Sequence, residues 1–116
     1  MRQRAQRRWR VAAAVALCAV LTQEPALADE AAVLNGKRIA AAHCARCHAI
    51  GRQGASPLAR APAFRTLSRR YPLDHLAEAL AEGIMTGHAE MPQFAFEPEE
   101  IGALLAYMRS ISDKRP

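Results

Sequence analysis

The five residues from Cys44 to His48 constrain this chain more than any other stretch. They read CARCH, in which Cys44 and Cys47 are separated by two residues and a histidine follows at once. This spacing places the two sulfurs about one helical turn apart, so both can form thioethers to the vinyl groups of a single haem. The imidazole of His48 is then held where a neutral ring nitrogen can ligate the iron.

Two other uses of a cysteine pair have to be weighed. A thioredoxin-like redox pair follows a strand, whereas residues 39–43 before the motif predict a helix. A structural zinc site needs four ligands, and no cysteine follows Cys47. A mixed zinc site of Cys44, Cys47, His48 and His88 can be drawn, although nothing in their spacing favours it. Covalent haem is the preferred interpretation.

Residues 1–28 have the order of a secretory signal peptide. Five arginines within residues 2–10 precede an apolar run over residues 11–21, which is too short to span a bilayer. Residues 26–28 read Ala-Leu-Ala, a small-x-small cleavage site, so we expect cleavage after Ala28 and export to the periplasm. A single domain over residues 29–116 would remain.

Two alternatives for the same segment are weaker. An uncleaved anchor would need a longer apolar stretch, and Pro25 interrupts its continuation. A lipoprotein signal would place a small residue before Cys18, where this chain has Leu17. Cys18 is therefore interpreted as an ordinary apolar residue of the signal.

The charge of the chain belongs mostly to this segment. The full chain has a net charge of +5, of which five arginines and one glutamate in residues 1–28 contribute +4. Residues 29–116 are therefore near +1, so their charge does not indicate a nucleic-acid or membrane-surface partner. A domain of this size has a marginal core, which a haem can complete in place of a disulfide.

Hydrophobic periodicity predicts helices and no strand of any length. The first helix is expected from about Glu30 to the cysteine motif, and Gly36 within it indicates close approach of another backbone or ring. An aperiodic loop over residues 49–61 follows and should wrap one edge of the haem. A further helix is expected from Pro72 to a cap at Gly83, with His75 on its surface.

The last helix is expected to begin near Pro98, with acidic residues in its first turn. Tyr107 is expected to flank its apolar stripe. Between residues 62 and 70, three arginines are interpreted as a solvated face, with a docking patch or a haem propionate contact as the sharper alternative. The stripe comprises Ile101, Leu104, Leu105, Met108 and Ile111, and the arginines are Arg65, Arg69 and Arg70.

With these elements located, residues 36–111 resemble a small class I cytochrome c of the bacterial periplasm. Gly36 stands eight residues before Cys44, as the family's first-helix glycine does, and Leu104 with Tyr107 matches the pair that packs across that glycine. Ala40 replaces an aromatic residue that family members often carry, so the helix contact should be looser or filled from elsewhere. The resemblance implies an all-α fold of about three to four helices wrapped around one covalently bound haem c.

The resemblance also implies the surroundings of the iron. Residues 61–64 look like the loop whose backbone carbonyl orients the proximal histidine, and we favour Pro62 over Pro57 because Phe64 and an apolar segment follow it. Met91, followed by Pro92, looks like the distal methionine loop. The implied haem-binding residues are Cys44, Cys47, His48, Pro62 and Met91, with His48 and Met91 on the metal.

Several residues compete for the sixth ligand. A methionine thioether favours ferrous iron and raises the reduction potential, as suits an electron carrier, and Met91 lies in a loop from which it can turn inward. Met85 is expected to be a packing residue, and Met108 to be core. His88 would give a bis-histidine haem of lower potential, and an open site is the remaining alternative.

The expected function is electron transfer by a periplasmic monohaem carrier, with no enzymatic activity of its own. Outer-sphere transfer at the haem edge requires only fixed ligands and a weak docking face for redox proteins. We expect a monomer that binds no nucleic acid and is not inserted in a membrane after cleavage. The alternatives are a haem-based sensor or enzyme with a displaceable distal ligand, and a cytochrome subunit of a larger oxidoreductase.

Overall fold

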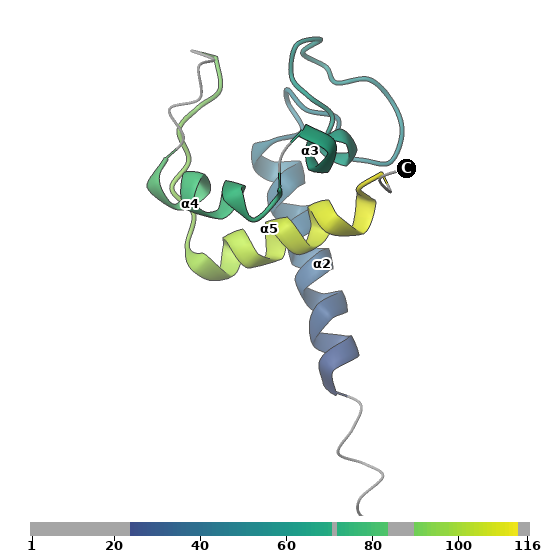
Figure 1. Cartoon of the computed structure of the whole chain (residues 1–116), viewed down its shortest axis with the longest axis vertical. Coiled ribbons are helices and arrows are strands. Elements are labelled where there is room, and N and C mark those ends of the chain that lie inside the picture. The colour runs from purple at the N-terminus through teal and green to yellow at the C-terminus, as the bar shows by residue number, and fades with distance from the viewer. Residues whose placement is uncertain (1–23, 71, 84–89, 114–116) are drawn as a thin grey trace, which may run out of the picture.

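A computed structural model describes residues 24–70, 72–83 and 90–113. Over these ranges the chain forms four α-helices and no strand (Figure 1). The helices are α2 (Glu24–His43), α3 (Phe64–Arg70), α4 (His75–Glu82) and α5 (Pro98–Ile111). The predicted all-α fold is confirmed.

The fold is built on the crossing of α2 and α5, which make the most extensive contact between helices (Figure 1). A Cβ atom on Gly36 would overlap the carbonyl oxygen of Ala103 and lie 2.8 Å from the Cβ of Tyr107. Only glycine permits this approach, which explains why α2 accepts a poor helix former here. The close approach expected at Gly36 is confirmed, and the contact is not loose, although Ala40 is fully buried without an aromatic ring.

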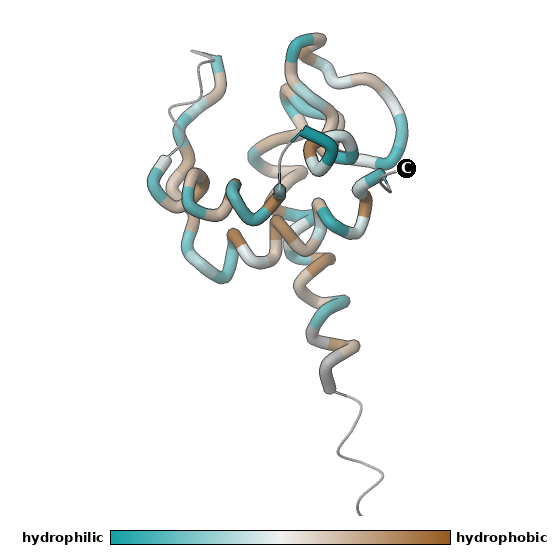
Figure 2. The backbone as a smooth tube through the Cα atoms, viewed as in Figure 1, coloured by the Kyte–Doolittle hydropathy of each residue, from teal (hydrophilic) through white to brown (hydrophobic). Residues whose placement is uncertain are grey.

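The sequence of α5 explains both its start and its burial. Glu97 caps the helix, and its backbone N–H donates to the Glu100 carboxylate at 3.0 Å in a capping box. Hydrophobic and hydrophilic positions alternate along the helix (Figure 2), and every member of the predicted apolar stripe is buried. Tyr107 does not merely flank this stripe: it is itself buried, and its hydroxyl donates to the Ile50 carbonyl at 2.7 Å.

The two faces of α5 have different neighbours. Ala103 and Tyr107 meet Gly36 of α2. Leu104, which the resemblance placed with Tyr107 across that glycine, is only 1% exposed and lines a cavity together with Met108. Tyr107 is thus confirmed beside Gly36 at the crossing, and Leu104 also reaches the cavity wall.

The helix expected from Pro72 begins three residues later, at His75. The amides of His75 and Leu76 donate to the carbonyls of Pro72 and Leu73 at 3.1 and 3.0 Å, each spanning three residues. Such bonds form a tight turn that leads into α4 rather than its first α-helical turn. Gly83 ends the helix, as predicted, with a φ of +80°, although its ψ of 99° lies outside the left-handed helical region that was expected. His75 is exposed, as expected.

Helix α2 also differs from the prediction, because it begins at Glu24 and not near Glu30. Alanine, leucine and glutamate are strong helix formers, so the helix continues through residues 26–28, where cleavage is predicted. Its first part extends beyond the crossing with α5 (Figure 1), and Leu27 and Leu34 are exposed. Most of the predicted signal, including Cys18, lies outside the described residues, and cleavage after Ala28 stays a prediction.

None of the helices in the described parts of the chain is both long enough and apolar enough to cross a membrane.

Candidate haem-binding site

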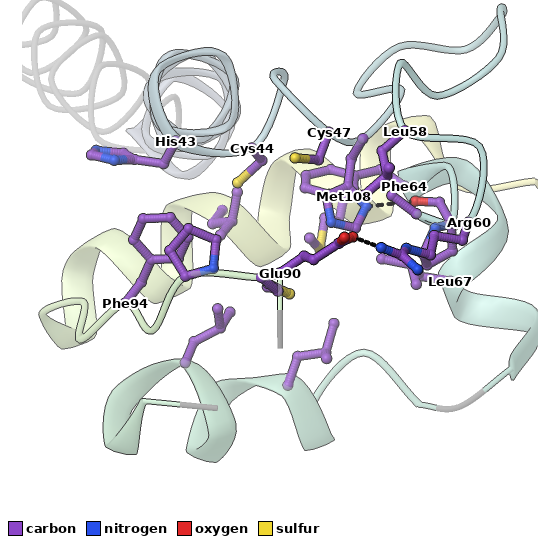
Figure 3. A pocket seen from close by; sticks show the side chains of 18 of the residues that line it. His43, Cys44, Cys47, Leu58, Arg60, Phe64, Leu67, Glu90, Phe94 and Met108 are labelled. Carbon is purple, nitrogen blue, oxygen red and sulfur yellow. Dashed lines mark hydrogen bonds and ion pairs between the residues drawn. The ribbon is translucent and has the colours of Figure 1, made fainter. Parts of the chain in front are cut away.

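The cysteine motif follows directly on the end of α2, and the chain keeps its helical curvature there. The amide of Cys44 donates to the Ala40 carbonyl at 2.9 Å. The amides of Cys47 and His48 both donate to the Cys44 carbonyl, at 3.1 and 2.9 Å. Both cysteines are free, and Figure 3 shows them beside the same cavity. The structure therefore places both cysteines of the motif at the wall of one cavity.

The cavity has a volume of about 380 Å³, within the range of pockets that bind small molecules or cofactors. Its walls come from the end of α2, the motif, the loop after it, α3, α4, the segment 90–96 and α5. Most of the lining is apolar, which suits a large planar cofactor with an apolar face. The principal apolar residues are Leu58, Phe64, Leu67, Leu80, Phe96 and Leu104.

The ring of His48 is oriented by one hydrogen bond. Its Nδ1 lies 2.8 Å from the backbone carbonyl oxygen of Pro62. A carbonyl oxygen can only accept, so Nδ1 carries the hydrogen and Nε2 of the neutral ring is left unprotonated. This is the state in which an imidazole ligates a metal, with its second nitrogen held by a backbone oxygen. The structure gives this bond to Pro62 and not to Pro57.

The loop between the motif and α3 is anchored at both ends. The Leu58 amide donates to the Cys47 carbonyl at 3.1 Å, and the Phe64 amide donates to the Ala49 carbonyl at 3.0 Å. The Phe64 ring lies 5.4 Å from the His48 ring, centroid to centroid. These contacts bring Pro62 beneath His48, although neither residue lies in a helix.

Two methionines line the cavity within the described residues. Met91 is half-buried on the segment between α4 and α5, and Met108 is buried on α5. Met108 is part of the hydrophobic core, as expected, but it also reaches the cavity wall. Met85 and His88, the other candidates for the sixth ligand, lie outside the described residues.

Three aromatic rings form a part of the cavity wall that the sequence did not reveal. The His43 ring meets Phe94 and Phe96 edge to face, at centroid distances of 5.6 and 5.5 Å. The two phenylalanine rings stack at 5.4 Å. The alternation of phenylalanines at positions 94 and 96 is a two-residue pattern in an isolated segment, too short to distinguish a cavity wall from a loop.

Two charged residues at the cavity were also missed. Arg60 from the loop and Glu90, the residue before Met91, line the cavity and form an ion pair (Figure 3). Both residues lie in aperiodic segments, where the sequence gives no register from which to infer a contact.

The three arginines of residues 62–70 do not form one solvated face. Arg65 is half-buried and donates to the Gly54 carbonyl at 2.9 Å, which fastens the loop to α3. Arg69 is exposed and pairs with Asp113, beyond the end of α5. Arg70 is exposed and borders the cavity. Arg65 is therefore more than part of a solvated face, because its guanidinium donates to two backbone carbonyls of the loop.

The chemistry of the cysteines does not favour dithiol catalysis. Burial raises the pKa of the Cys44 thiol to about 11, whereas redox-active pairs lower the pKa of the attacking cysteine. Within residues 24–70, 72–83 and 90–113, no group of three or more histidine, cysteine, aspartate or glutamate side chains is placed to hold a metal ion. A cavity bordered by two cysteines and one imidazole instead fits a tethered cofactor.

Comparison with known proteins agrees with this geometry. The family model described as cytochrome c matches residues 33–112. The chain belongs to the cytochrome c family. Cytochrome c-552 of Bradyrhizobium diazoefficiens is 32% identical over 99 residues, which cover 82% of this chain and 91% of that protein. No solved structure matches the chain significantly.

Membership of the cytochrome c family implies a covalently bound haem c, and the residues present fit it. The cavity is apolar, the two cysteines of the CxxCH motif border it, and His48 offers an unprotonated Nε2. Cys44 and Cys47 would hold the group, and His48 would ligate its iron. The matched region begins within α2 and ends one residue after α5, so it contains every element that lines the cavity.

Proposed function

We propose that this cytochrome c is a periplasmic carrier of single electrons whose iron is ligated by His48 and Met91. Haem c supplies an iron that gains and loses one electron without forming a bond to a substrate. The observation that carries the proposal is the hydrogen bond from His48 Nδ1 to Pro62, in a cavity that both motif cysteines and Met91 line.

His48 serves as the fixed ligand. The Pro62 carbonyl holds the ring in the tautomer that leaves Nε2 free, and Phe64 packs beside the ring at 5.4 Å. Because the ring cannot easily turn, little rearrangement accompanies a change in the iron's charge. Rapid electron transfer requires this rigidity.

Met91 supplies the sixth ligand. Its neutral thioether would ligate the iron together with His48 and favour the ferrous state, so no substrate would need to bind there. Met91 is placed on a segment between helices and followed by Pro92, which restricts the backbone. Met108 lies on α5, where it contributes to the core, and its position is fixed by helix packing.

The partners and location follow from the same proposal. A carrier whose iron is held by His48 and Met91 would exchange electrons without binding a substrate, and would need only transient contact with redox proteins. The predicted signal peptide would deliver the chain to the periplasm, where haem c is attached. The carrier would act there as a monomer. Neither nucleic acid nor a membrane is required as a partner.

Attachment is tested with Cys44→Ala and Cys47→Ala, each produced with the haem maturation system and stripped with acidic acetone. Each variant should keep at most one thioether and mature poorly, whereas all haem in the wild-type protein should resist extraction. Normal covalent haem in both variants would contradict attachment through this pair.

Ligation is tested with Met91→Ala, and Met108→Leu is the matched control because both methionines border the cavity. Met91→Ala should lose the far-red charge-transfer band of methionine-ligated ferric haem, bind carbon monoxide readily when reduced, and have a lower potential. Met108→Leu should keep the band and the potential.

An unchanged band in Met91→Ala would move the ligand to Met85 or Met108. Rapid carbon monoxide binding by the wild-type protein would instead favour the sensor or enzyme with a displaceable ligand. A protein that co-purifies with a membrane oxidoreductase would be a subunit and not a free carrier.

A further inference from the structure

The mouth of the cavity is bridged by one ion pair. Arg60 lies two residues before Pro62, whose carbonyl orients His48. Glu90 lies directly before Met91. Their side chains form an ion pair, and both line the cavity (Figure 3). The pair thus connects the loop on the histidine side to the segment that carries the methionine.

We propose that Arg60 and Glu90 are positioning residues that hold the Met91 segment against the loop, and so slow the replacement of Met91 by an added ligand. The inference rests on the proposed ligation by Met91. Neither side chain is assigned a contact with the iron, and each acts through the backbone next to it.

The position of the pair along the chain supports this role. The segment 90–96 is also tied to α4, because the Phe96 amide donates to the Leu80 carbonyl at 3.1 Å. Phe96 lies five residues after Met91. Phe94 and Phe96, which pack on His43, both follow Met91 in the chain as well. The ion pair restrains the opposite end of the segment, one residue from Met91.

The exposure of the pair sets the size of its effect. The side chains of Arg60 and Glu90 are 61% and 54% exposed, so water and salt screen their attraction. A pair of this kind changes an equilibrium or a rate modestly. We expect a two- to fivefold effect on ligand exchange, about what exposed pairs contribute, and a strong dependence on salt.

The test measures the rate at which imidazole displaces methionine from the ferric protein at low salt. Arg60→Gln and Glu90→Gln should each speed displacement about two- to fivefold, and the double variant should be no faster than the single ones. The exchanged pair, Arg60→Glu with Glu90→Arg, should return the rate towards that of the wild-type protein. About 1 M salt should remove the differences.

Arg109→Gln is the matched control. Arg109 forms an ion pair with Asp74, also between exposed side chains, but neither residue lines the cavity. This variant removes the same charge from the surface and should leave the displacement rate unchanged. A rate increase equal to that of Arg60→Gln would show an effect of net charge and overturn the proposal.

Two further results would overturn it: additive effects of the two single variants, or an exchanged pair as fast as either of them. The far-red methionine band separates this failure from that of the proposed function. If the wild-type protein has the band and the effects of the two single variants are additive, the role of the ion pair is rejected and ligation by Met91 stands. Without the band, ligation by Met91 fails and this inference fails with it.

Discussion

Helices α2 and α5 meet in two ways along their length. At their crossing they approach so closely that Gly36 has no room for a Cβ atom against the Ala103 carbonyl. Further along, Cys44 just beyond α2 and Met108 on α5 border a cavity of about 380 Å³. The two helices are therefore in direct contact at their crossing. Farther along, they border a cavity that a cofactor can fill.

The difference separates the residues that set stability from those that set the properties of the haem. Protein interiors are close-packed, so a crossing without space tolerates no added atoms, while a cavity of this size costs stability until it is filled. Substitutions at the crossing should change the free energy of unfolding and leave the folded site alone. Substitutions at the cavity wall that remove a ligand or a ring beside His48 should change the site.

The largest effect is expected for Gly36→Ala. The new methyl group would overlap the backbone of Ala103, so α2 and α5 must separate, at a cost of about 3 kcal/mol. Denaturant unfolding of the mature protein measures this loss. The same change at Gly102 on α5 meets open space and should stabilise the protein by about 0.5 to 1 kcal/mol.

Equal stability of the two glycine variants would contradict the close crossing. The comparison also predicts that the folded Gly36→Ala protein keeps the reduction potential of the wild type. A shifted potential would show that the crossing and the cavity are coupled more tightly than their packing suggests.

An intermediate effect is expected for Phe64→Leu at the cavity wall. Loss of ring volume from a side chain only 3% exposed should cost about 1 to 2 kcal/mol. The ring packs beside His48, so its loss should also admit water and lower the reduction potential, because a more polar site favours the ferric state. Redox titration measures the shift, and an unchanged potential would remove Phe64 from the control of the site.

The smallest effect is expected for Tyr107→Phe, which removes a single hydroxyl. That hydroxyl donates to the Ile50 carbonyl at 2.7 Å and links α5 to the loop after the motif. Its loss should cost about 1 kcal/mol at neutral pH, measured by denaturant unfolding. A cost near zero would show that water replaces the bond fully.

The same residue gives a dependence on pH. Burial raises the pKa of Tyr107 above its ordinary value of 10.0, an effect that Arg52 opposes. The neutral phenol is thus favoured in the folded state, and its contribution to stability is present below pH 10 and lost as the pH rises through the folded pKa. Tyr107→Phe should therefore lose less stability than the wild-type protein as the pH rises above 10. Equal losses of stability in the two proteins would contradict a raised pKa of Tyr107.

The sequence predicted the features that depend on local pattern. The CARCH motif predicted the site, Gly36 predicted a close helix contact, and the periodicity of α5 predicted its buried stripe. It misplaced the starts of α2 and α4, because helix formers continue upstream of Glu30 and the turn at Pro72 uses shorter hydrogen bonds. Periodicity alone placed Tyr107 beside the stripe, whereas the family resemblance placed it across Gly36, where the structure has it buried.

The contacts that no pattern predicted lie between aperiodic segments. The ion pair of Arg60 with Glu90 and the packing of His43 on Phe94 and Phe96 join residues far apart in the chain. Each partner lies on an irregular segment or at a helix end, where hydrophobic periodicity gives no orientation. Such contacts require the folded arrangement of the whole cavity.

The optical spectrum of the matured wild-type protein, oxidised and reduced, tests the central claim most directly. We predict haem that acidic acetone does not extract, together with the far-red charge-transfer band of a methionine bound to ferric iron. Covalent haem without that band would contradict ligation by Met91 and favour a bis-histidine or open site. Haem that is released by the acid would contradict attachment through Cys44 and Cys47.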